Sequence, residues 1–347
     1  MRDSFGRKID YMRISVTDRC NFRCSYCLPP QGASRMEAKE ILEYREILEI
    51  VRAAIRLGIR HFRVTGGEPF VRPGIMGFLE ELSALPGAES VSVTTNGSLL
   101  EARLEELKRM GIRGINVSLD TLDGERFLRL TGQDELKRVL SAIRRAARLG
   151  FDSLKINCVP MREVNRGELT ELAALAREYP LDVRFIELMP VGCGLEGQRI
   201  PQEETVRILE ERYGPIKWED EEEPGQAPCR KRRGRGPAVY GHLEGFLGDV
   251  GFISAMSHEF CSTCSRIRLL ADGGLKPCLN APCGANLRDL LRAGASGEEL
   301  EQALAAVIWK KPARHGFEQN RPGRAKEGTR KEKGRSAGRE FMASIGG

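Results

Sequence analysis

Three cysteines near the start of the chain, Cys20, Cys24 and Cys27, constrain its fold more than any other feature. They follow the spacing CxxxCxxC, so one short loop gathers three thiolates and supplies no fourth. Thiolates clustered in this way suit zinc or an iron–sulfur cluster. A structural zinc site is normally closed by four protein ligands, so three cysteines leave one metal position open to a molecule that is not protein. A zinc knuckle or a disulfide remnant is the alternative interpretation.

The length and charge of the chain exclude several classes of protein. Its 347 residues, with a net charge of +6, allow one large α/β domain and a smaller appendage. The apolar runs are shorter than a membrane span, and the N-terminus lacks the apolar core of a secretory signal, so we expect a cytoplasmic protein. Ten cysteines in that compartment are metal ligands or buried thiols rather than disulfides. The modest positive charge is compatible with an anionic substrate.

Short β-branched or alternating runs recur along the chain, and a longer segment with helical periodicity follows each of them. The expected strands are Arg13–Val16, His61–Thr65, Ser90–Thr94, Gly114–Leu119, Ser153–Cys158 and Val183–Leu188. The expected helices are Leu42–Leu57, Met76–Leu85, Glu101–Met110, Glu135–Leu149, Glu168–Glu178 and Glu203–Arg212. Roughly six βα units are visible, fewer than the eight of a complete barrel. The pattern therefore predicts an α/β fold with a parallel sheet, a partial (β/α)6 TIM-like barrel.

Composition changes beyond the last of these units. The stretch Glu219–Glu223 is acidic and Arg230–Arg235 is basic, which indicates a boundary or an exposed loop. Residues 310–339 are rich in Lys, Arg and Gly, and we interpret them as a solvated, partly disordered tail. No interleaved row of aromatic residues supports a nucleic-acid arm there. We expect three parts, a barrel over 1–215, a smaller cysteine-bearing C-terminal domain over 216–311 and a basic tail over 312–347.

Unusual residues lie where the expected strands end, which in an α/β barrel is the side that binds ligands. Residues 65–69 read Thr-Gly-Gly-Glu-Pro, and paired glycines let the backbone approach a ligand closely, although a plain turn is also compatible. Lys155 lies inside an apolar strand and needs a partner or an anion there. Arg13 and Arg63 also lie within strands, and a triphosphate would satisfy both.

A second set of three cysteines lies near the other end of the chain, at Cys261, Cys264 and Cys278. It is again one ligand short of closure, unless Cys283 serves as the fourth ligand of a zinc site, and that alternative stays open. Between these cysteines, Arg266 and Arg268 alternate so that both guanidinium groups point to the same face of a strand. Two such groups beside a metal suit phosphates or the edge of a base. A solvent-facing stripe on an edge strand is the alternative.

Together these motifs resemble the GTP 3′,8-cyclase family. These are radical S-adenosylmethionine (radical SAM) enzymes that catalyse the first step of molybdenum cofactor biosynthesis. The likeness covers nearly the whole chain through Trp309. It rests on residues 13–29, 65–69, 93–97, 116–120, 185–190, 260–279 and the terminal Gly-Gly. It implies that GTP is converted to (8S)-3′,8-cyclo-7,8-dihydroguanosine 5′-triphosphate. In the implied reaction, one electron cleaves SAM, a 5′-deoxyadenosyl radical takes H3′ from GTP, and C3′ then attacks guanine C8.

The resemblance also implies roles for individual residues. Two 4Fe-4S clusters would be held, one by Cys20, Cys24 and Cys27 and the other by Cys261, Cys264 and Cys278. SAM would contact Tyr26, Gly67, Ser118 and Met189. GTP would contact Arg13, Arg63, Thr94, Lys155, Arg266, Ile267 and Arg268. The terminal Gly346 and Gly347 would reach into the active site, which residues without side chains do at no steric cost. Four cysteines match no ligand of the family, namely Cys158, Cys193, Cys229 and Cys283.

The partners implied by the resemblance are GTP as substrate, an electron donor of low potential of the flavodoxin or ferredoxin type, and cyclic pyranopterin monophosphate synthase as the next enzyme. We expect a monomer or homodimer that binds neither membrane nor nucleic acid. Two other hypotheses remain. One is a different two-cluster radical SAM enzyme, such as a peptide-modifying maturase. The other is a zinc-stabilised nucleic-acid-binding protein that uses the basic tail.

Overall fold

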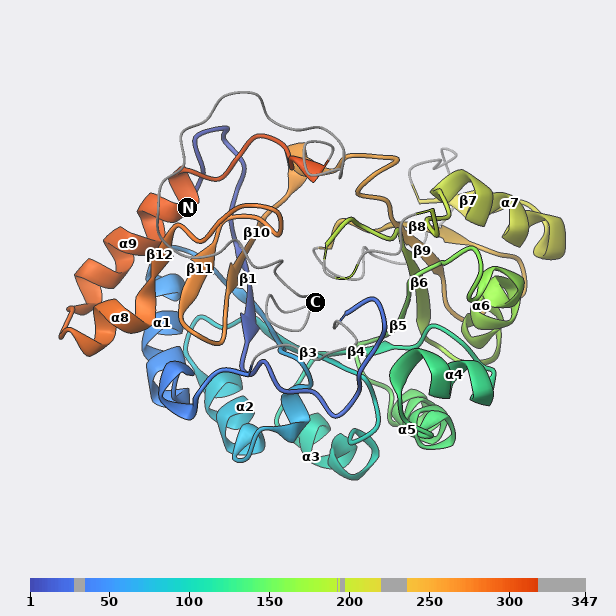
Figure 1. Ribbon diagram of the computed structural model, residues 1–347, viewed down its shortest axis with the longest axis horizontal. Coiled ribbons are helices and arrows are strands. Elements are labelled where there is room, and N and C mark those ends of the chain that lie inside the picture. Colours follow the sequence, from blue (N-terminus) through green and yellow to red (C-terminus); the bar gives the residue numbers. More distant parts are fainter. Residues whose placement is uncertain (28–34, 192, 194–196, 220–235, 318–347) are drawn as a thin grey trace.

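The computed structural model of the protein describes residues 1–27, 35–191, 193, 197–219 and 236–317 (Figure 1). Its central feature is a run of parallel strands, β1 to β6, which lie side by side in chain order. They are β1 (Tyr11–Ser15), β2 (His61–Thr65), β3 (Ser90–Thr95), β4 (Gly114–Ser118), β5 (Ser153–Cys158) and β6 (Asp182–Ile186). Each expected strand is confirmed to within three residues at its ends.

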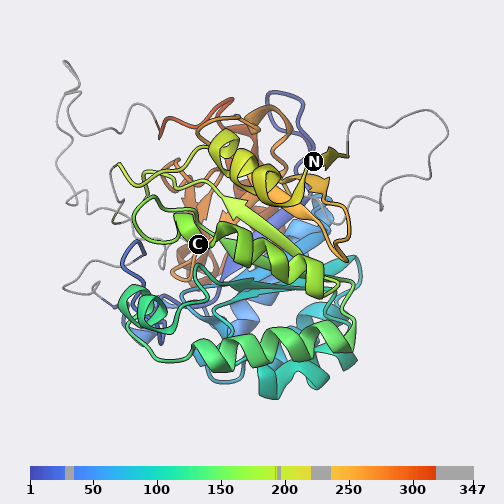
Figure 2. The same ribbon diagram turned by 90° about the vertical axis from the view of Figure 1, so that its right-hand side faces the viewer.

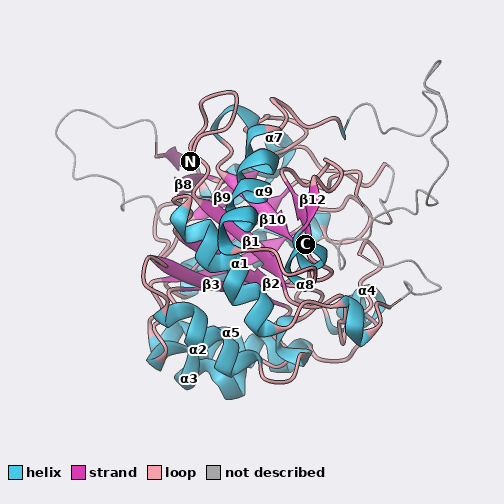
Figure 3. Ribbon diagram, turned by 90° about the vertical axis from the view of Figure 1, so that its left-hand side faces the viewer, coloured by secondary structure: helices cyan, strands magenta, loops and turns pink. Residues whose placement is uncertain are grey.

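Helices cover the outer face of this sheet and make it a barrel wall (Figure 3). They are α1 (Tyr44–Arg56), α2 (Ile75–Ala84), α3 (Leu104–Arg109), α4 (Gly124–Thr131), α5 (Leu136–Leu149), α6 (Leu169–Glu178) and α7 (Gln202–Tyr213). Figure 2 shows α5, α6 and α7, coloured green to yellow, in succession over one flank. In α5, the side chains of Val139, Ile143 and Ala146 recur at helical spacing and are buried, so one stripe of the helix faces the sheet.

Helix α4 is not among the helices that the sequence analysis predicts. Its N-cap is Asp123, whose side chain accepts a hydrogen bond from the backbone N–H of Arg126 at 2.7 Å. Its C-terminus is Gly132, with a φ of 71° in the left-handed region. These are ordinary start and stop signals for a helix. They enclose a segment too short for helical periodicity to stand out from a turn.

The C-terminal part of the chain extends the sheet at both edges. Strands β7 (Lys217–Trp218), β8 (Val239–His242) and β9 (Val250–Ile253) lie beyond β6, and β10 (Arg266–Leu269), β11 (Gly274–Lys276) and β12 (Ala285–Asn286) lie beyond β1. Within the described residues these twelve strands form one sheet, whose edges are β12 and β7. The barrel is therefore open, as expected. Helices α8 (Leu287–Arg292) and α9 (Gly297–Trp309) pack beside α1 (Figure 1).

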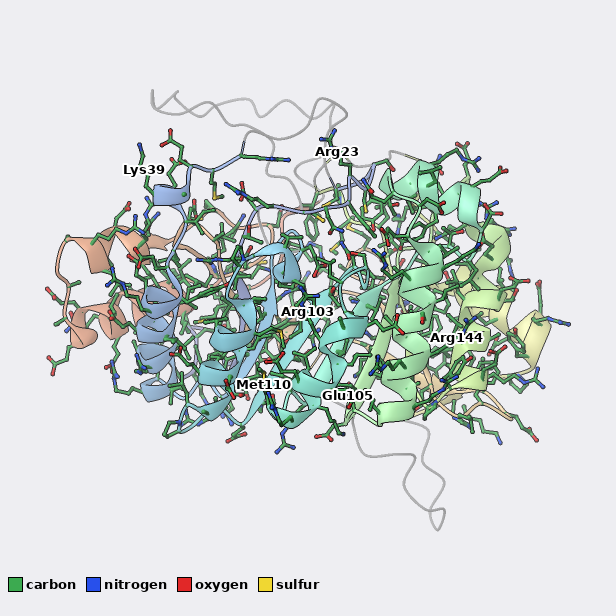
Figure 4. All side chains as sticks on the ribbon, turned by 90° about the horizontal axis from the view of Figure 1, so that it is seen from below. Arg23, Lys39, Arg103, Glu105, Met110 and Arg144 are labelled. Carbon is green, nitrogen blue, oxygen red and sulfur yellow. The ribbon has the colours of Figure 1, made fainter. Side chains whose placement is uncertain are left out.

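The two ends of the barrel carry different elements. Arg23 and Lys39, from the connection between β1 and α1, lie at one end, and Glu105 and Met110 lie at the other (Figure 4). Since β1 leads into that connection and Met110 precedes β4, the end with Arg23 is the carboxyl end of the strands. No helix in the described part of the chain is long and apolar enough to cross a membrane.

Candidate active site

A cavity of about 290 Å³ lies inside the barrel, between the loops beyond the carboxyl ends of the strands and the segments that carry the second cysteine triad. Both cysteine triads line it, although they come from opposite ends of the chain. The residues of the sequence analysis that line it are Arg13, Cys20, Cys24, Tyr26, Cys27, Arg63, Gly67, Thr94, Ser118, Met189, Cys261, Cys264, Arg266, Arg268 and Cys278. Parallel pairing of β1 with β10 places the two triads at opposite ends of β1, because Cys20 follows its carboxyl end, whereas Cys264 precedes Arg266, which pairs with Tyr11 at its amino end.

The first cysteine loop is supported by the helix that the sequence analysis did not predict. The backbone N–H groups of Arg23 and Ser25 donate to the carbonyl oxygens of Thr131 at 2.7 Å and Leu130 at 3.0 Å, at the C-terminal end of α4. Below them, the Phe22 ring packs edge-on against Phe127, with 5.7 Å between ring centroids. The loop thus rests on groups that a helix end leaves without partners inside the helix.

The thiols of the first loop are buried in acidic surroundings. Burial raises the pKa of Cys20 to about 11, and Glu68 adds to the shift, although hydrogen bonds from Phe22 and Asn96 oppose it. Burial likewise raises the pKa of Cys24 well above its ordinary value, with further contributions from Cys27 and Asp120. Without a metal these thiols stay protonated at neutral pH, so binding a metal must displace their protons.

The second triad has opposite surroundings. Burial on its own would raise the pKa of the Cys264 thiol, but Arg266 and Lys311 outweigh this effect and lower the pKa to about 7. Burial raises the pKa of the Cys261 thiol, and the neighbouring Cys278 and Cys264 add to that shift. Cationic side chains therefore favour the thiolate of Cys264 in this triad.

The paired glycines at the end of β2 pack against the first cysteine loop. A Cβ atom on Gly67 would lie 2.3 Å from the carbonyl oxygen of Arg19, and one on Gly66 would lie 2.8 Å from that of Thr17. The N–H groups of Gly67 and Glu68 donate to the carbonyl oxygens of Thr17 at 2.7 Å and Arg19 at 2.8 Å. Any side chain here would push the cysteine loop away from the strand, so both glycines set the position of the loop.

The carboxylate of Glu68 joins the ends of two strands. It is fully buried and accepts hydrogen bonds from Thr95 Oγ1 at 2.8 Å and from the backbone N–H groups of Asn96 at 2.7 Å and Phe70 at 3.1 Å. Burial raises its pKa to about 7, against these hydrogen bonds. Asn96 in turn directs its side-chain amide to Asn21 at 2.9 Å and to Cys20 Sγ at 3.8 Å. Glu68 is thus connected to the first triad through the end of β3.

Tyr26 is fixed by a carboxylate at the end of β4. Its hydroxyl donates to Asp120 Oδ2 at 2.7 Å, and the backbone N–H of Val159 donates to Oδ1 at 2.8 Å. Burial raises the pKa of Asp120 to about 6, although both hydrogen bonds lower it. The aromatic ring that precedes Cys27 is therefore held in one orientation at the wall of the cavity.

Arginines from three neighbouring strands form a row on one wall. Arg13 of β1 is in register with Arg63 of β2 on one side and with Arg268 of β10 on the other. Burial, together with neighbouring guanidinium groups, lowers the pKa of all three, that of Arg268 to about 10. Arg63 Cζ lies 5.6 Å from the centroid of the Tyr11 ring. So much positive charge in one buried row favours an anionic ligand.

Sequence analysis missed a fifth arginine in the cavity lining. Arg184 of β6 is 4% exposed and donates through Nη2 to Asn116 Oδ1 and Asn157 Oδ1, both at 2.6 Å. The signal was available, because Arg184 lies in an apolar strand just as Arg13 and Arg63 do. Two asparagines, one on β4 and one on β5, hold its guanidinium group beside the cavity.

Two residues expected to contact GTP are not among those that line the cavity. The ammonium group of Lys155 donates to the Tyr240 hydroxyl at 2.9 Å and lies 3.8 Å from an Asp182 oxygen, so protein partners meet the need of this buried lysine. Ile267 is fully buried in the core, as the alternation of side chains along a strand requires. Thr94 does line the cavity, and its Oγ1 is buried without a hydrogen-bond partner among the described residues.

Cys283 is exposed and is not among the lining residues of the cavity. Gly346, Gly347, Cys229 and most of the expected tail lie outside the described residues. Within the described part of the chain, no three His, Cys, Asp or Glu side chains gather closely enough to hold a single metal ion. Two sets of three cysteines around one cavity fit larger groups, and their soft thiolates are the ligands that iron–sulfur clusters require.

Comparisons with known proteins agree with this geometry. Residues 14–176 match the family model of the Radical SAM superfamily, and residues 181–317 match that of Molybdenum Cofactor Synthesis C. The GTP 3′,8-cyclase of Pelotomaculum thermopropionicum is 40% identical to this chain over 91% of it and 95% of its own length. That of Clostridium perfringens is 38% identical over the whole of both chains. Molybdenum cofactor biosynthesis protein 1 of Bos taurus is 38% identical over 91% of this chain and 48% of its own length.

Solved structures show a similar arrangement of strands and helices. The crystal structure of Streptococcus suis SuiB matches with a TM-score of 0.59 and 15% identity, over 86% of this chain and 68% of SuiB. The structure of SuiB bound to S-adenosylmethionine matches with a TM-score of 0.55 and 16% identity, over 86% of this chain and 68% of that one. At such low identity the likeness establishes the fold and nothing of the reaction.

Proposed function

We infer the function of this chain from its family, because it belongs to the GTP 3′,8-cyclases of the radical SAM superfamily. It is a lyase that converts GTP to (8S)-3′,8-cyclo-7,8-dihydroguanosine 5′-triphosphate, the first step of molybdenum cofactor biosynthesis. One observation carries this conclusion. Two cysteine triads, each one ligand short, line the same cavity as a row of arginines.

We assign one 4Fe-4S cluster to each triad, Cys20, Cys24 and Cys27 for the first and Cys261, Cys264 and Cys278 for the second. Each cluster then keeps one iron without a protein ligand. When bound, the first cluster and SAM supply the one-electron chemistry that removes a hydrogen atom from the substrate. The residues of the chain bind and orient the two small molecules and exclude water from them.

The wall next to the first triad suits SAM. We assign its contacts to Tyr26, Gly67, Ser118 and Met189, which all line the cavity. Tyr26 offers a ring that its hydrogen bond to Asp120 holds still, and Gly67 exposes backbone because it has no side chain. This preorganisation matters because the reacting atoms must be held about 3–3.5 Å apart before transfer.

The wall next to the second triad suits GTP. We assign the triphosphate and base to Arg13, Arg63, Arg266 and Arg268, with Thr94 Oγ1 as a further polar group that needs a partner. Arg184 joins this set, since Asn116 and Asn157 hold it at the cavity wall. Lys155 and Ile267 are not assigned to GTP. Lys155 pairs with Tyr240 and Asp182, and Ile267 packs in the core. Guanidinium forks bind phosphate oxygens in pairs and so fix orientation as well as charge.

The wider setting follows from the family. We propose that the protein works in the cytoplasm as a monomer or homodimer, receives electrons from a flavodoxin- or ferredoxin-type donor, and passes its product to cyclic pyranopterin monophosphate synthase. We also propose the division into 1–215, 216–311 and 312–347, with Gly346 and Gly347 at the active site.

Anaerobic reconstitution tests the proposed function. The reconstituted protein is incubated with SAM and dithionite plus GTP, and the cyclised nucleotide and 5′-deoxyadenosine are measured by mass spectrometry. We expect both products with GTP, and neither the nucleotide nor excess 5′-deoxyadenosine when ATP replaces it. Zinc in both triads with no iron or sulfide would overturn the proposal in favour of a zinc-stabilised protein. Radical chemistry on a peptide but not on GTP would favour a maturase.

A further inference from the structure

Two buried cations, Arg7 and Lys311, hold the backbone around the second cysteine triad. Neither belongs to the strands of the barrel wall, and the sequence analysis gave neither a role. Arg7 lies in the N-terminal segment before β1, and Lys311 lies just after α9. They are 8% and 2% exposed. A buried cation is costly unless its donors are satisfied, so the partners of these two indicate what they do.

Lys311 joins two cysteine segments. Its Nζ donates to the carbonyl oxygen of Arg266 at 2.8 Å and to that of Pro277 at 2.6 Å. Arg266 follows Cys264 by two residues, and Pro277 immediately precedes Cys278. One ammonium group thus fixes the distance between the two backbones that carry these cysteines, and it also lines the cavity.

Arg7 joins the third cysteine segment to the chain around Lys311. It donates through Nη1 to the carbonyl oxygen of Cys261 at 2.7 Å and through Nη2 to that of Pro312 at 2.7 Å. It also donates to the carbonyl oxygens of Ala313 at 3.1 Å and Lys311 at 3.3 Å. Asp3 fixes the guanidinium from behind, with 2.6 Å between Arg7 Nε and Asp3 Oδ2. A planar fork with five donors suits such a multiple junction.

The segment after Lys311 completes this arrangement. The backbone N–H of His315 donates to the Cys261 thiol, and His315 and Phe317 line the cavity. All three cysteine segments are therefore hydrogen-bonded to Arg7 or to residues 311–315. By contrast, the preceding residue, Lys310, is exposed.

We propose that Arg7 and Lys311 are positioning residues for the second cluster, which hold its three cysteine segments apart in the arrangement that the cluster needs. The inference rests on the proposed function, in which these cysteines bind a 4Fe-4S cluster. A cluster with three protein ligands lacks the fourth that would help to organise its site, so the surrounding chain must preorganise the other three. Neither cation is a ligand of the cluster.

The test isolates the second cluster. In a parent chain with Cys20, Cys24 and Cys27 changed to Ala, only the second triad can bind iron. We expect about four irons per chain in this parent after anaerobic reconstitution. Lys311→Met should lose at least about half of that iron, together with the electron paramagnetic resonance signal of the reduced cluster. Lys310→Met, the matched control, should keep both. Lys311→Arg should retain both the iron and the signal, since it keeps the charge and the donors.

Each outcome decides between the two proposals. A parent without iron would overturn the proposed function and this inference with it. A parent with a full cluster and a Lys311→Met variant equal to it, in iron and in signal, would overturn the inference alone.

The same substitution in the chain with all its cysteines tests folding. Loss of the second cluster with the first retained, seen as continued SAM cleavage, supports the inference. If Lys311→Met loses both clusters, Arg7→Met and its exposed control Arg2→Met decide the question. Selective loss of the second cluster in Arg7→Met would then support the proposal. Loss of both clusters there too would show a merely structural role and overturn it.

Discussion

Cys20 of the first triad and Cys264 of the second have similar burial and opposite electrostatic surroundings. Burial raises the pKa of Cys20 in the first triad to about 11, and the nearby Glu68 raises it further. In the second triad, Arg266 and Lys311 overcome burial and bring the pKa of Cys264 to about 7. Both cysteines are partly exposed, so charge rather than depth makes the difference.

This contrast suits two different tasks. The potential of an iron–sulfur cluster depends on nearby charge and on hydrogen bonds to its sulfurs. Carboxylates such as Glu68 and Asp120 near the first triad oppose the addition of an electron, and a cluster that is hard to reduce is a strong reductant once reduced. Cations near the second triad favour an anionic ligand at its open iron. We infer that one fold provides a reducing site and a substrate site by placing acids at one strand end and bases at another.

Removal of one thiol from the first triad should have the largest effect on activity. Cys24→Ala leaves two protein ligands for the first cluster, so we expect no 5′-deoxyadenosine and no cyclised nucleotide. About half of the iron should remain, in the second triad. Iron analysis and mass spectrometry measure these outcomes. Cys283→Ala is the control, because Cys283 is exposed and lies outside the cavity lining, and it should leave both products unchanged. Cyclisation by Cys24→Ala would contradict the assignment.

Thiol reactivity of the iron-free protein tests the contrast in charge directly. At pH 7, about half of Cys264 but only about one part in 10⁴ of Cys20 is thiolate. Because nucleophilicity falls as the pKa falls, we expect alkylation of Cys264 to be faster by about 10²-fold rather than 10⁴-fold. The measurement is iodoacetamide labelling from pH 6 to pH 9, followed by peptide mass mapping.

The pH profile and a variant give the control for this reactivity. Labelling of Cys264 should rise with a midpoint near its pKa of about 7, whereas labelling of Cys20 should still be rising at pH 9. Arg266→Met removes a cation that lowers the pKa of Cys264, so its midpoint should move to higher pH while Cys20 is unaffected. Equal rates for the two thiols at pH 7 would show that their surroundings do not differ as described.

The arginine row tests the second half of the comparison. Arg268→Met removes one of the three guanidinium groups in register across β10, β1 and β2. A hydrogen bond to a charged group contributes about 1.5–3 kcal/mol, so we expect kcat/KM for GTP to fall by about 10- to 100-fold. The first cluster should keep its iron and its reduced-state spectrum. Arg52→Met, at an exposed position on α1, serves as the control. An unchanged kcat/KM in Arg268→Met would remove this residue from the substrate site.

Sequence patterns predicted most of the barrel because its signals are local. Alternating apolar runs and helical periodicity lie within each βα unit, and both cysteine triads are visible as spacings. Arg13 and Arg63 could be selected because a charge inside an apolar strand requires an explanation. The same reasoning would have found Arg184, which the motif-based interpretation passed over.

What the sequence did not predict depends on contacts between distant segments. The partner of Lys155 is Tyr240, 85 residues away, so the sequence could indicate the need for a partner but not its identity. Arg7 meets Cys261 across 254 residues, and no spacing could show that. Likewise, Gly66 and Gly67 suggested a ligand, whereas their immediate neighbour is the backbone of the cysteine loop. The close approach was predicted correctly and the contact with the cysteine loop was not foreseen, while the contact of Gly67 with SAM stays a proposal.

The smallest expected effect concerns the different supports of the two triads. The first loop rests on the end of α4, whereas Arg7 and Lys311 hold the second triad. Asp123→Ala removes the N-cap of α4 and should lower the free energy of unfolding by about 1 kcal/mol.

The local loss of protection against hydrogen exchange should be confined to the first cysteine loop. Hydrogen exchange of the Arg23 and Ser25 amides, which donate to the end of α4, should speed up while the amides around Cys264 stay as protected as before. Asp134→Ala, at an exposed position just beyond the helix, should change neither quantity. Faster exchange around Cys264 would show that the supports of the two triads are coupled, since α4 is the only element altered by the substitution.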